Sequence, residues 1–354
     1  MARIEVNGIA LNVEVWPSPP GPLSLTVGEG ESPIEVSASV LPSYAQSRGS
    51  ERNGLQFDMS GRPPSPAPGY DTSGQPPSPA SGRGVGGEGR GAEGVPPLLL
   101  LHGFTGSAGS WRGRLPALAR HTTVVAVDLI GHGCSDAPDD PARYDMDRCV
   151  ADLLAVLDHL GLPRVAALGY SMGARVALRL AAAAPDRVAA LVLESGSPGL
   201  ATEEERRARC ASDEALAERI AREGIEEFVH FWEAIPLFAT QQGLSPDVRA
   251  ALRRQRLCNS ATGLANSLRG MGTGAQDSLW GRLGGITTPA LIVTGALDEK
   301  FRAIGHAMSR AMPDARLVVV PDAGHAVHLE RPGEFDQIVV QFLLFLKRRQ
   351  RSCL

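Results

Sequence analysis

The 354-residue sequence has no strong net charge, few aromatic residues and no long apolar run. Its formal net charge of −4 gives no electrostatic basis for binding nucleic acid or an acidic membrane surface. No apolar stretch approaches the roughly 18 residues that a membrane-spanning helix needs, and residues 1–15 alternate instead of forming the apolar block of a signal peptide. We therefore predict a cytoplasmic protein with no nucleic-acid partner and no membrane insertion.

The cysteines lack the arrangement that a disulfide framework or a zinc site requires. There are five of them, which is an odd number, and they are scattered along the chain without a CxxC pair. Such usage is typical of reduced thiols in a cytosolic protein, so we predict no disulfide framework and no metal site.

Composition divides the chain into five segments. Residues 1–16 alternate around Asn7-Gly8, which predicts a β-hairpin of the core. Residues 17–96 are rich in Pro, Gly and Ser, bury too little apolar surface to offset their ordering entropy, and are predicted to be a disordered insertion. The remaining segments are a first core segment, a helical lid and a second core segment, predicted at 97–196, 197–284 and 285–350.

Strand and helix patterns alternate in both core segments. Short apolar runs predict strands at Leu98–Leu101, Val124–Val127, Val165–Leu168, Val188–Leu193, Ala290–Val293 and Leu317–Val320. Amphipathic patterns predict core helices at Met146–Leu160, Arg175–Ala184 and Phe335–Leu346, and lid helices at Glu203–Arg209, Asp213–Arg222, Ile225–Trp232 and Ser245–Arg256. Such alternation predicts an α/β fold, a doubly wound and mostly parallel sheet, and the helical block within it is most simply an inserted lid.

A candidate nucleophile stands in Gly169-Tyr170-Ser171-Met172-Gly173. This GxSxG segment follows a predicted buried strand and opens a predicted helix, which is the context of a nucleophile elbow. The glycines leave room for a strained turn that lifts the Ser171 hydroxyl above the sheet. The alternative interpretation is an ordinary serine in a tight turn between strand and helix.

A serine hydroxyl needs a neighbouring base, and the base needs an orienting acid. A nucleophile elbow in a mostly parallel sheet with an inserted helical lid indicates the α/β-hydrolase fold. In that fold the order along the chain is Ser, acid, His, and Asp298 and His325 each follow a predicted strand. We predict that His325 takes the proton of Ser171 and that Asp298 holds the imidazole. The competing side chains have other expected roles. His328 and His132 are predicted to be structural, and Asp128 is predicted to cap a turn. Glu299 lies one residue further from the strand end than Asp298, and Asp322 precedes His325 too closely to be its orienting acid.

The oxyanion hole is predicted from two backbone positions. His102-Gly103-Phe104 follows the first core strand, and Met172 follows the nucleophile. The N–H groups of Phe104 and Met172 are expected to stabilise a developing oxyanion.

Arginines indicate an anionic substrate. Arg175 comes four residues after Ser171, on the same face of the predicted helix. Arg209 and Arg256 lie in the predicted lid together with Trp232. Since the guanidinium fork suits carboxylates, we predict a small anionic molecule as substrate.

Four segments now identify a resemblance. Residues 169–175, 101–107, 194–200 and 266–274 closely resemble those of the 2-succinyl-6-hydroxy-2,4-cyclohexadiene-1-carboxylate (SHCHC) synthase family of menaquinone biosynthesis. The likeness covers nearly the whole chain except the insertion. The triad segments are shared with α/β hydrolases in general, whereas the arginine after the elbow and the lid segments single out this family.

The resemblance implies a carbon–oxygen lyase without cofactor or metal. Members of the family eliminate pyruvate from 2-succinyl-5-enolpyruvyl-6-hydroxy-3-cyclohexene-1-carboxylate, with Ser171, activated by His325, as the base by analogy. By motif match, the substrate site is lined by Tyr170, Arg175, Arg209, Trp232 and Arg256. Ala174 departs from the glycine that is more frequent in the family, and the insertion has no counterpart there.

Two other functions share these features. A serine hydrolase of ester or C–C bonds acting on an anionic substrate needs the same triad, but it proceeds through an acyl intermediate and makes no demand for three arginines. A catalytically idle binding protein is disfavoured by the intact Ser171, Asp298 and His325, since an idle site is free to lose any of them.

Overall fold

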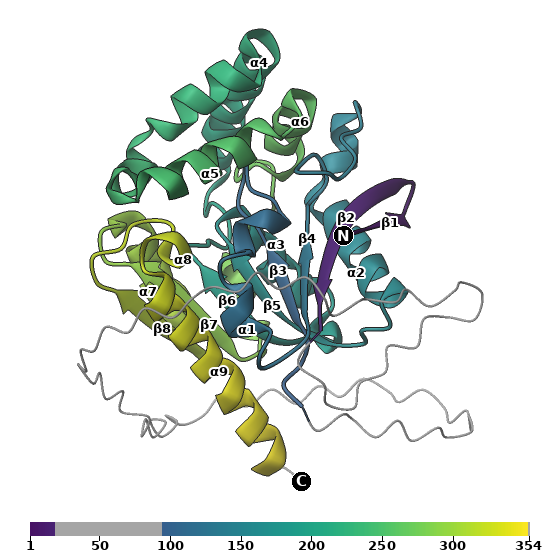
Figure 1. The fold of residues 1–354 in the computed structure, drawn as a ribbon, viewed down its shortest axis with the longest axis vertical. Helices are drawn as coiled ribbons and strands as arrows, with labels where there is room; N and C mark the ends of the chain where they lie inside the picture. Colours follow the sequence, from purple (N-terminus) through teal and green to yellow (C-terminus); the bar gives the residue numbers. More distant parts are fainter. Residues whose placement is uncertain (18–93, 353–354) are drawn as a thin grey trace, which may run out of the picture. The chain divides into compact units, whose positions relative to one another are not determined.

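The computed structural model describes residues 1–17 and 94–352 (Figure 1). The predicted insertion at 17–96 therefore lies almost entirely outside the described residues, and its disorder stays a prediction. Within the part described, strands alternate with helices as the sequence predicts.

An eight-stranded sheet forms the centre of the fold. Its spatial order is β1-β2-β4-β3-β5-β6-β7-β8, with β1 and β2 antiparallel to their neighbours and all later pairs parallel. The strands are β1 (Ala2–Val6), β2 (Ile9–Trp16), β3 (Leu98–Leu101), β4 (Val124–Val127), β5 (Val165–Tyr170), β6 (Val188–Glu194), β7 (Ala290–Gly295) and β8 (Ala315–Val320). Since parallel strands end at the same edge, the loops after β3, β5, β7 and β8 meet there.

The N-terminal hairpin is confirmed. β1 and β2 pair from Ala2 opposite Val13 to Val6 opposite Ile9. The two turn residues have positive φ, 49° at Asn7 and 80° at Gly8, and a two-residue hairpin turn of type I′ requires this conformation at both positions.

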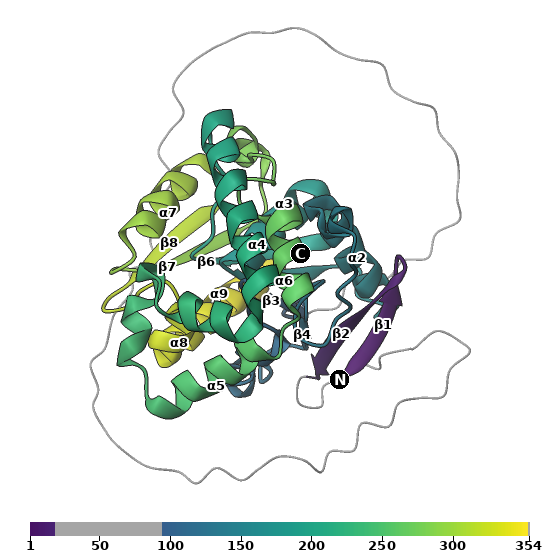
Figure 2. The same ribbon diagram turned by 90° about the horizontal axis from the view of Figure 1, so that it is seen from above.

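Helices cover both faces of the sheet, which explains why β3 is a run of four buried leucines. Leu99 and Leu101 pack in the core beneath α2 (Met146–His159), α3 (Met172–Ala183) and α7 (Glu299–Ala311). Leu98 and Leu100 face the opposite core beneath α1 (Leu115–Leu118) and α9 (Pro332–Ser352). Figures 1 and 2 show α2 and α3 on one side of the sheet and α9 on the other.

Between β6 and β7 the chain forms a helical insertion, residues 197–284, beyond one end of the strands (Figure 1). Its helices are α4 (Glu203–Glu233), α5 (Pro246–Leu257) and α6 (Ala261–Met271). It has its own apolar cluster, in which Phe228 of α4 packs with Leu264 and Leu268 of α6. Seen from above in Figure 2, α4 and α6 cross over the sheet.

The division of α4 corrects the predicted helix boundaries. Two separate helices were predicted at Glu203–Arg209 and Asp213–Arg222, but the chain is continuously helical through residues 210–212. These three residues include neither glycine nor proline, so nothing there breaks the helix. The only residue of α4 with non-helical angles is Gly224 (φ 81°, ψ 177°), just before the predicted third helix. Helices α6 and α7 were not predicted.

In the part of the chain that the structure describes, no helix has the length and apolar content to cross a bilayer.

Candidate active site

Three side chains from three loops meet at the carboxyl edge of the sheet. The Nε2 atom of His325 lies 3.0 Å from the Ser171 Oγ, and its Nδ1 lies 2.6 Å from the Asp298 Oδ2. With the Nδ1 proton facing the carboxylate, Nε2 is left to accept the hydroxyl proton. His325 is 1% exposed and Asp298 8%, so the hydrogen bond between them is shielded from bulk water. We call the three hydrogen-bonded residues Ser171, His325 and Asp298 the relay.

The turn that carries Ser171 is strained, and neighbouring glycines make it possible. Ser171 has φ 52° and ψ −106°, between the end of β5 and the start of α3. A side chain on Gly173 would collide with the carbonyl of Leu101, and one on Gly169 with the carbonyl of Gly173. The close approach of strand and helix that a nucleophile elbow requires is therefore present.

Aromatic rings enclose the histidine. The ring centroid of Phe301 lies 4.5 Å from that of His325, and those of Tyr170 and Phe238 lie at 5.4 and 6.2 Å. Burial, followed by the negative charge of Glu194, raises the pKa of Tyr170 well above its ordinary value, so this phenol is neutral at physiological pH.

Asp128 is a structural residue, as predicted. Its Oδ1 accepts a hydrogen bond from the Ala108 N–H at 2.6 Å, and its Oδ2 accepts one from the Cys134 N–H at 2.8 Å. It therefore caps the loops at this edge of the sheet. His132 beside it is fully buried, and burial lowers its pKa to about 3.

The other competing residues do not reach the relay. Asp322 points outward and pairs with Arg331 at 3.1 Å. Glu299 is the exposed first residue of α7. His328 is buried and bonds to Glu194.

The two predicted oxyanion-hole positions flank the elbow. Met172 is the first residue of α3, and the first N–H of a helix has no acceptor within that helix. Phe104 lies in the loop after β3 and lines a cavity whose other walls include Tyr170, Phe238, Arg256 and His328. Their role as oxyanion donors stays a prediction.

Comparison with known proteins identifies the family. A family model described as the alpha/beta hydrolase fold matches residues 96–332. A protein of Bacillus subtilis (strain 168), provisionally named 2-succinyl-6-hydroxy-2,4-cyclohexadiene-1-carboxylate synthase, is 48% identical over 246 residues, covering 70% of this chain and 89% of that protein. The synthase of that name from Salmonella agona (strain SL483) is 33% identical and is covered to 96%, with 72% of this chain aligned.

The chain belongs to the SHCHC synthase family. The structure of MenH from S. aureus is also similar, with a TM-score of 0.69, 34% identity, and coverage of 72% of this chain and 95% of that one. As a member of the SHCHC synthase family, the protein is an enzyme on an α/β-hydrolase fold.

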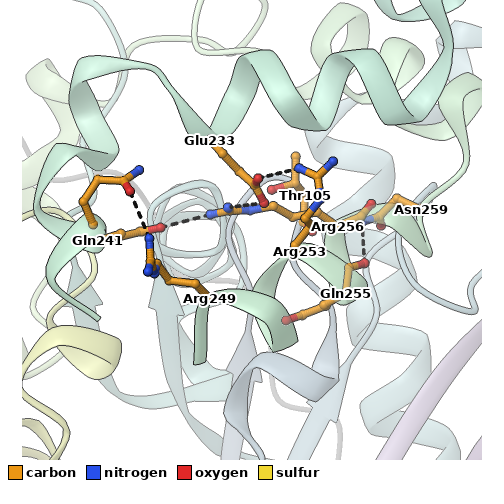
Figure 3. A network of polar contacts seen from close by, with 9 residues as sticks. Thr105, Glu233, Gln241, Arg249, Arg253, Gln255, Arg256 and Asn259 are labelled. Atoms are coloured by element: carbon orange, nitrogen blue, oxygen red, sulfur yellow. Dashed lines mark hydrogen bonds and ion pairs between the residues drawn. The ribbon is translucent and has the colours of Figure 1, made fainter. Parts of the chain in front are cut away.

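Arg256 reaches the cavity of this SHCHC synthase family member from α5. Its Nη1 donates to Glu233 Oε1 at 3.2 Å and its Nη2 donates to Gln241 Oε1 at 3.1 Å (Figure 3). The other oxygen of Glu233 accepts from Arg253 at 2.7 Å. One carboxylate thus lies between two guanidinium groups, and this group keeps a net positive charge. Since a guanidinium has five N–H donors, Arg256 has three that these two contacts do not use.

Arg175 is buried behind the elbow. Its Nη1 donates to the carbonyl of Met271 at 2.8 Å and to Oε1 of Gln276 at 2.5 Å. Burial, followed by the charge of Arg209, lowers its pKa to about 10, so it stays cationic at neutral pH. It is not among the residues that line the cavity, and its contact with substrate stays a prediction.

Arg209 and Trp232 lie at different depths in the insertion. Arg209 pairs with the buried Asp213 at 2.7 Å and keeps 41% of its side chain exposed. Trp232 packs edge-on against Phe104 and Phe238, with distances between ring centroids of 5.4 and 5.6 Å. Its ring therefore joins the insertion to the predicted oxyanion loop.

Sequence analysis missed five polar or aromatic residues of the cavity: Thr105, Ser110, Phe238, Gln241 and Gln255. Phe238 and Gln241 lie in a 3₁₀ helix, Pro236–Gly243, whose sequence has no helical or strand period to place them. Among the described residues, no group of acidic, histidine or cysteine side chains is arranged to hold a metal ion.

Proposed function

We propose that the enzyme eliminates pyruvate from 2-succinyl-5-enolpyruvyl-6-hydroxy-3-cyclohexene-1-carboxylate to give SHCHC in menaquinone biosynthesis, as a carbon–oxygen lyase. The observation that carries this proposal is the Ser171–His325–Asp298 relay, with contacts of 3.0 and 2.6 Å, in a member of the SHCHC synthase family.

The relay acts as a general base. Ser171 Oγ takes a proton from a ring carbon of the substrate and passes its own proton to His325 Nε2, while Asp298 stabilises the imidazolium. The electron pair of the broken C–H bond forms a ring double bond, and the C–O bond to the enolpyruvyl group breaks. The leaving group takes up a proton and is released as pyruvate. No acyl-enzyme forms.

Substrate charge is matched by the site. The backbone N–H groups of Phe104 and Met172 stabilise the negative charge that develops on the succinyl carbonyl. Arg256, Arg175 and Arg209 receive the carboxylates, and Tyr170 and Trp232 form apolar walls. The insertion acts as a lid, since residues from it border the cavity beside the relay.

The decisive experiment follows pyruvate release from the enolpyruvyl cyclohexene, generated by the preceding enzyme of the pathway. Ser171→Ala is expected to lower kcat by at least about 10²–10⁴, the usual value of general-base catalysis. Ser309→Ala on α7, whose hydroxyl donates only to the carbonyl of His306, is the control and should keep full activity. Pyruvate release by Ser171→Ala at the wild-type rate would remove the serine from the mechanism.

A simple activated ester assayed in parallel tests the alternative, a serine hydrolase of ester or C–C bonds. The same relay serves that chemistry. Ester turnover without pyruvate release would keep the triad and replace the lyase by the hydrolase.

A further inference from the structure

A carboxylate that the proposed mechanism does not use is buried beside the relay. Glu194, the last residue of β6, is 0% exposed. Its Oε1 accepts two hydrogen bonds from one residue, from the backbone N–H of His328 and from its Nδ1, both at 2.9 Å. Its Oε2 has no partner among the described residues. Because burying a carboxylate is costly, this position requires a reason.

Glu194 contacts both catalytic segments. Its backbone carbonyl accepts the N–H of Ser171 at 2.8 Å, so its main chain holds the nucleophile turn. Its side chain holds His328, which lies three residues after His325 in the short helix α8 (Val327–Glu330). One residue therefore ties the loop of the base to the turn of the nucleophile.

The bond also fixes a ring that borders the cavity. His328 is 2% exposed, with its centroid 4.8 Å from that of Trp111 and 4.7 Å from that of Tyr170. Tyr170 in turn packs against His325. Because Nδ1 of His328 is bonded to the carboxylate, its imidazole cannot turn without breaking that hydrogen bond, and Tyr170 packs against the ring so held.

A second carboxylate, Glu330, bonds to the backbone on either side of His325. Glu330 accepts hydrogen bonds from the N–H groups of Gly324 at 2.6 Å and Ala326 at 3.2 Å. These bonds shape the loop on either side of the histidine, but they do not attach it to β6, whose last residue holds the nucleophile turn. That attachment comes from Glu194.

We infer that Glu194 is a positioning residue, which acts through His328 to fix the loop of His325 against the nucleophile turn and so sets the distance from Ser171 Oγ to His325 Nε2. This inference rests on the proposed catalytic role of the relay. It assigns a purpose to a buried, hydrogen-bonded pair that lies outside the triad.

The first test compares Glu194→Leu with Glu194→Gln in the full-length enzyme. Glutamine keeps an oxygen at the position that accepts both N–H groups, whereas leucine removes the acceptor at similar volume. Since a displacement of about 1 Å in an active site costs about 10² in rate, Glu194→Leu should lower kcat about 100-fold and leave KM nearly unchanged. Glu194→Gln should restore most of kcat.

A second pair of variants approaches the same bond from the other side. In His328→Asn the amide nitrogen takes the place of Nδ1 and still donates to Glu194, whereas His328→Phe keeps a ring without a donor. The asparagine variant should therefore be the more active of the two. If Glu194→Leu does not fold, this pair tests whether the hydrogen bond between Glu194 and His328 is needed for activity, and equal activity of the two variants would overturn the inference.

Crystal structures of the variants distinguish a positioning role of Glu194 from a purely stabilising one. In folded Glu194→Leu the distance between Ser171 Oγ and His325 Nε2 should exceed its value of 3.0 Å. An unchanged distance or a wild-type kcat in that variant would overturn the inference. Equal loss of kcat in Glu194→Gln and Glu194→Leu would also overturn it, since the hydrogen bond would then not be what matters.

The same structures keep this inference distinct from the proposed function. If the wild-type enzyme releases no pyruvate, the lyase proposal fails. The distance between Ser171 and His325 in the Glu194 variants still decides whether Glu194 positions the relay.

Discussion

Arg256 is the arginine that the structure places in the cavity wall, and the proposed substrate gives it a carboxylate to bind. Arg256→Ala should raise KM for the enolpyruvyl cyclohexene about 10- to 100-fold, because a charged hydrogen bond contributes about 1.5–3 kcal/mol and 1.4 kcal/mol is about tenfold in affinity. The fall in kcat should be smaller. Steady-state kinetics of pyruvate release measure both constants.

Arg254 provides the matched control for this prediction. It lies two residues away on α5 and is exposed, so Arg254→Ala removes the same charge from the same helix without touching the cavity. Its KM should equal that of the wild type. If both variants change KM equally, Arg256 acts only through the general charge of the helix.

His132 makes the stability of the fold depend on pH. It is buried, its Nδ1 donates to the carbonyl of Ile130 at 3.0 Å, and its Nε2 has no partner among the described residues. Burial, followed by the neighbouring His102, lowers its pKa from 6.5 to about 3. Between these two values the unfolded chain binds a proton that the folded chain does not, so His132 causes stability to fall as the pH falls through this window.

A substitution isolates this effect. His132→Asn keeps a donor for Ile130 and cannot be protonated, so its free energy of unfolding should decrease less between pH 7 and pH 4 than that of the wild type. Urea unfolding at both pH values measures the difference. Asp336, whose pKa is raised by burial to about 6, contributes with the opposite sign and is present in both proteins. Equal acid sensitivity of the two proteins would show that His132 is not responsible.

Among the elements, α4 is interrupted at one residue. Gly224 adopts φ 81° and ψ 177°, a conformation that is open essentially to glycine alone, and a side chain there would meet no atom within 4 Å. Gly224→Ala should therefore lower the free energy of unfolding by about 1–3 kcal/mol through backbone strain alone. Denaturant unfolding measures this loss.

The control for this prediction is Gly243→Ala. Gly243 lies in the same insertion, also has open space around it, and does not have a positive φ. Gly243→Ala should lower the free energy of unfolding by well under about 1 kcal/mol or raise it slightly, since alanine restricts the unfolded chain. A similar loss in both variants would contradict the strain at Gly224.

The helices also show which signals in the sequence are sufficient to predict where a helix begins and ends. The amphipathic pattern of Ser245–Arg256 predicted α5 almost to its ends, because Ser245 caps it and Pro246 starts it. The predicted gap at 210–212 was wrong: these three residues are exposed, but the helix continues through them. α7 was not predicted, although Asp298 caps its N-terminus.

At the scale of the whole molecule, the undescribed segment 18–93 connects the two strands that flank β4. Trp16 of β2 and Leu98 of β3 both pair with Val124 of β4, on its opposite sides. Since paired strands lie about 4.8 Å apart, the two ends of the core are separated by about 10 Å. A short loop can therefore replace the segment.

Replacing residues 18–93 by a flexible linker of about six residues, which reaches about 20 Å, should leave kcat and KM unchanged. If the segment is disordered as predicted, shortening the loop about tenfold should raise the free energy of unfolding by about 2 kcal/mol through reduced closure entropy. Enzyme assay and denaturant unfolding test both parts. An insoluble or inactive product would mean that the segment packs on the enzyme.

The sequence by itself determined the α/β core, the nucleophile turn and the chain order of Ser171, Asp298 and His325. These features depend on local signals: period of apolar residues, glycines beside a strained turn, and polar residues directly after strands. Parallel strands then bring the three loops to one edge whatever the details of packing.

Only the tertiary structure decided which distant side chains share a bond. Glu194 meets His328 across 134 positions and Arg256 meets Glu233 across 23, and neither pair has a local pattern that distinguishes it from any other acid and base. Their pairing follows from how the helical insertion and the His325 loop pack on the sheet. Because that packing depends on the whole core at once, no short stretch of sequence contains it.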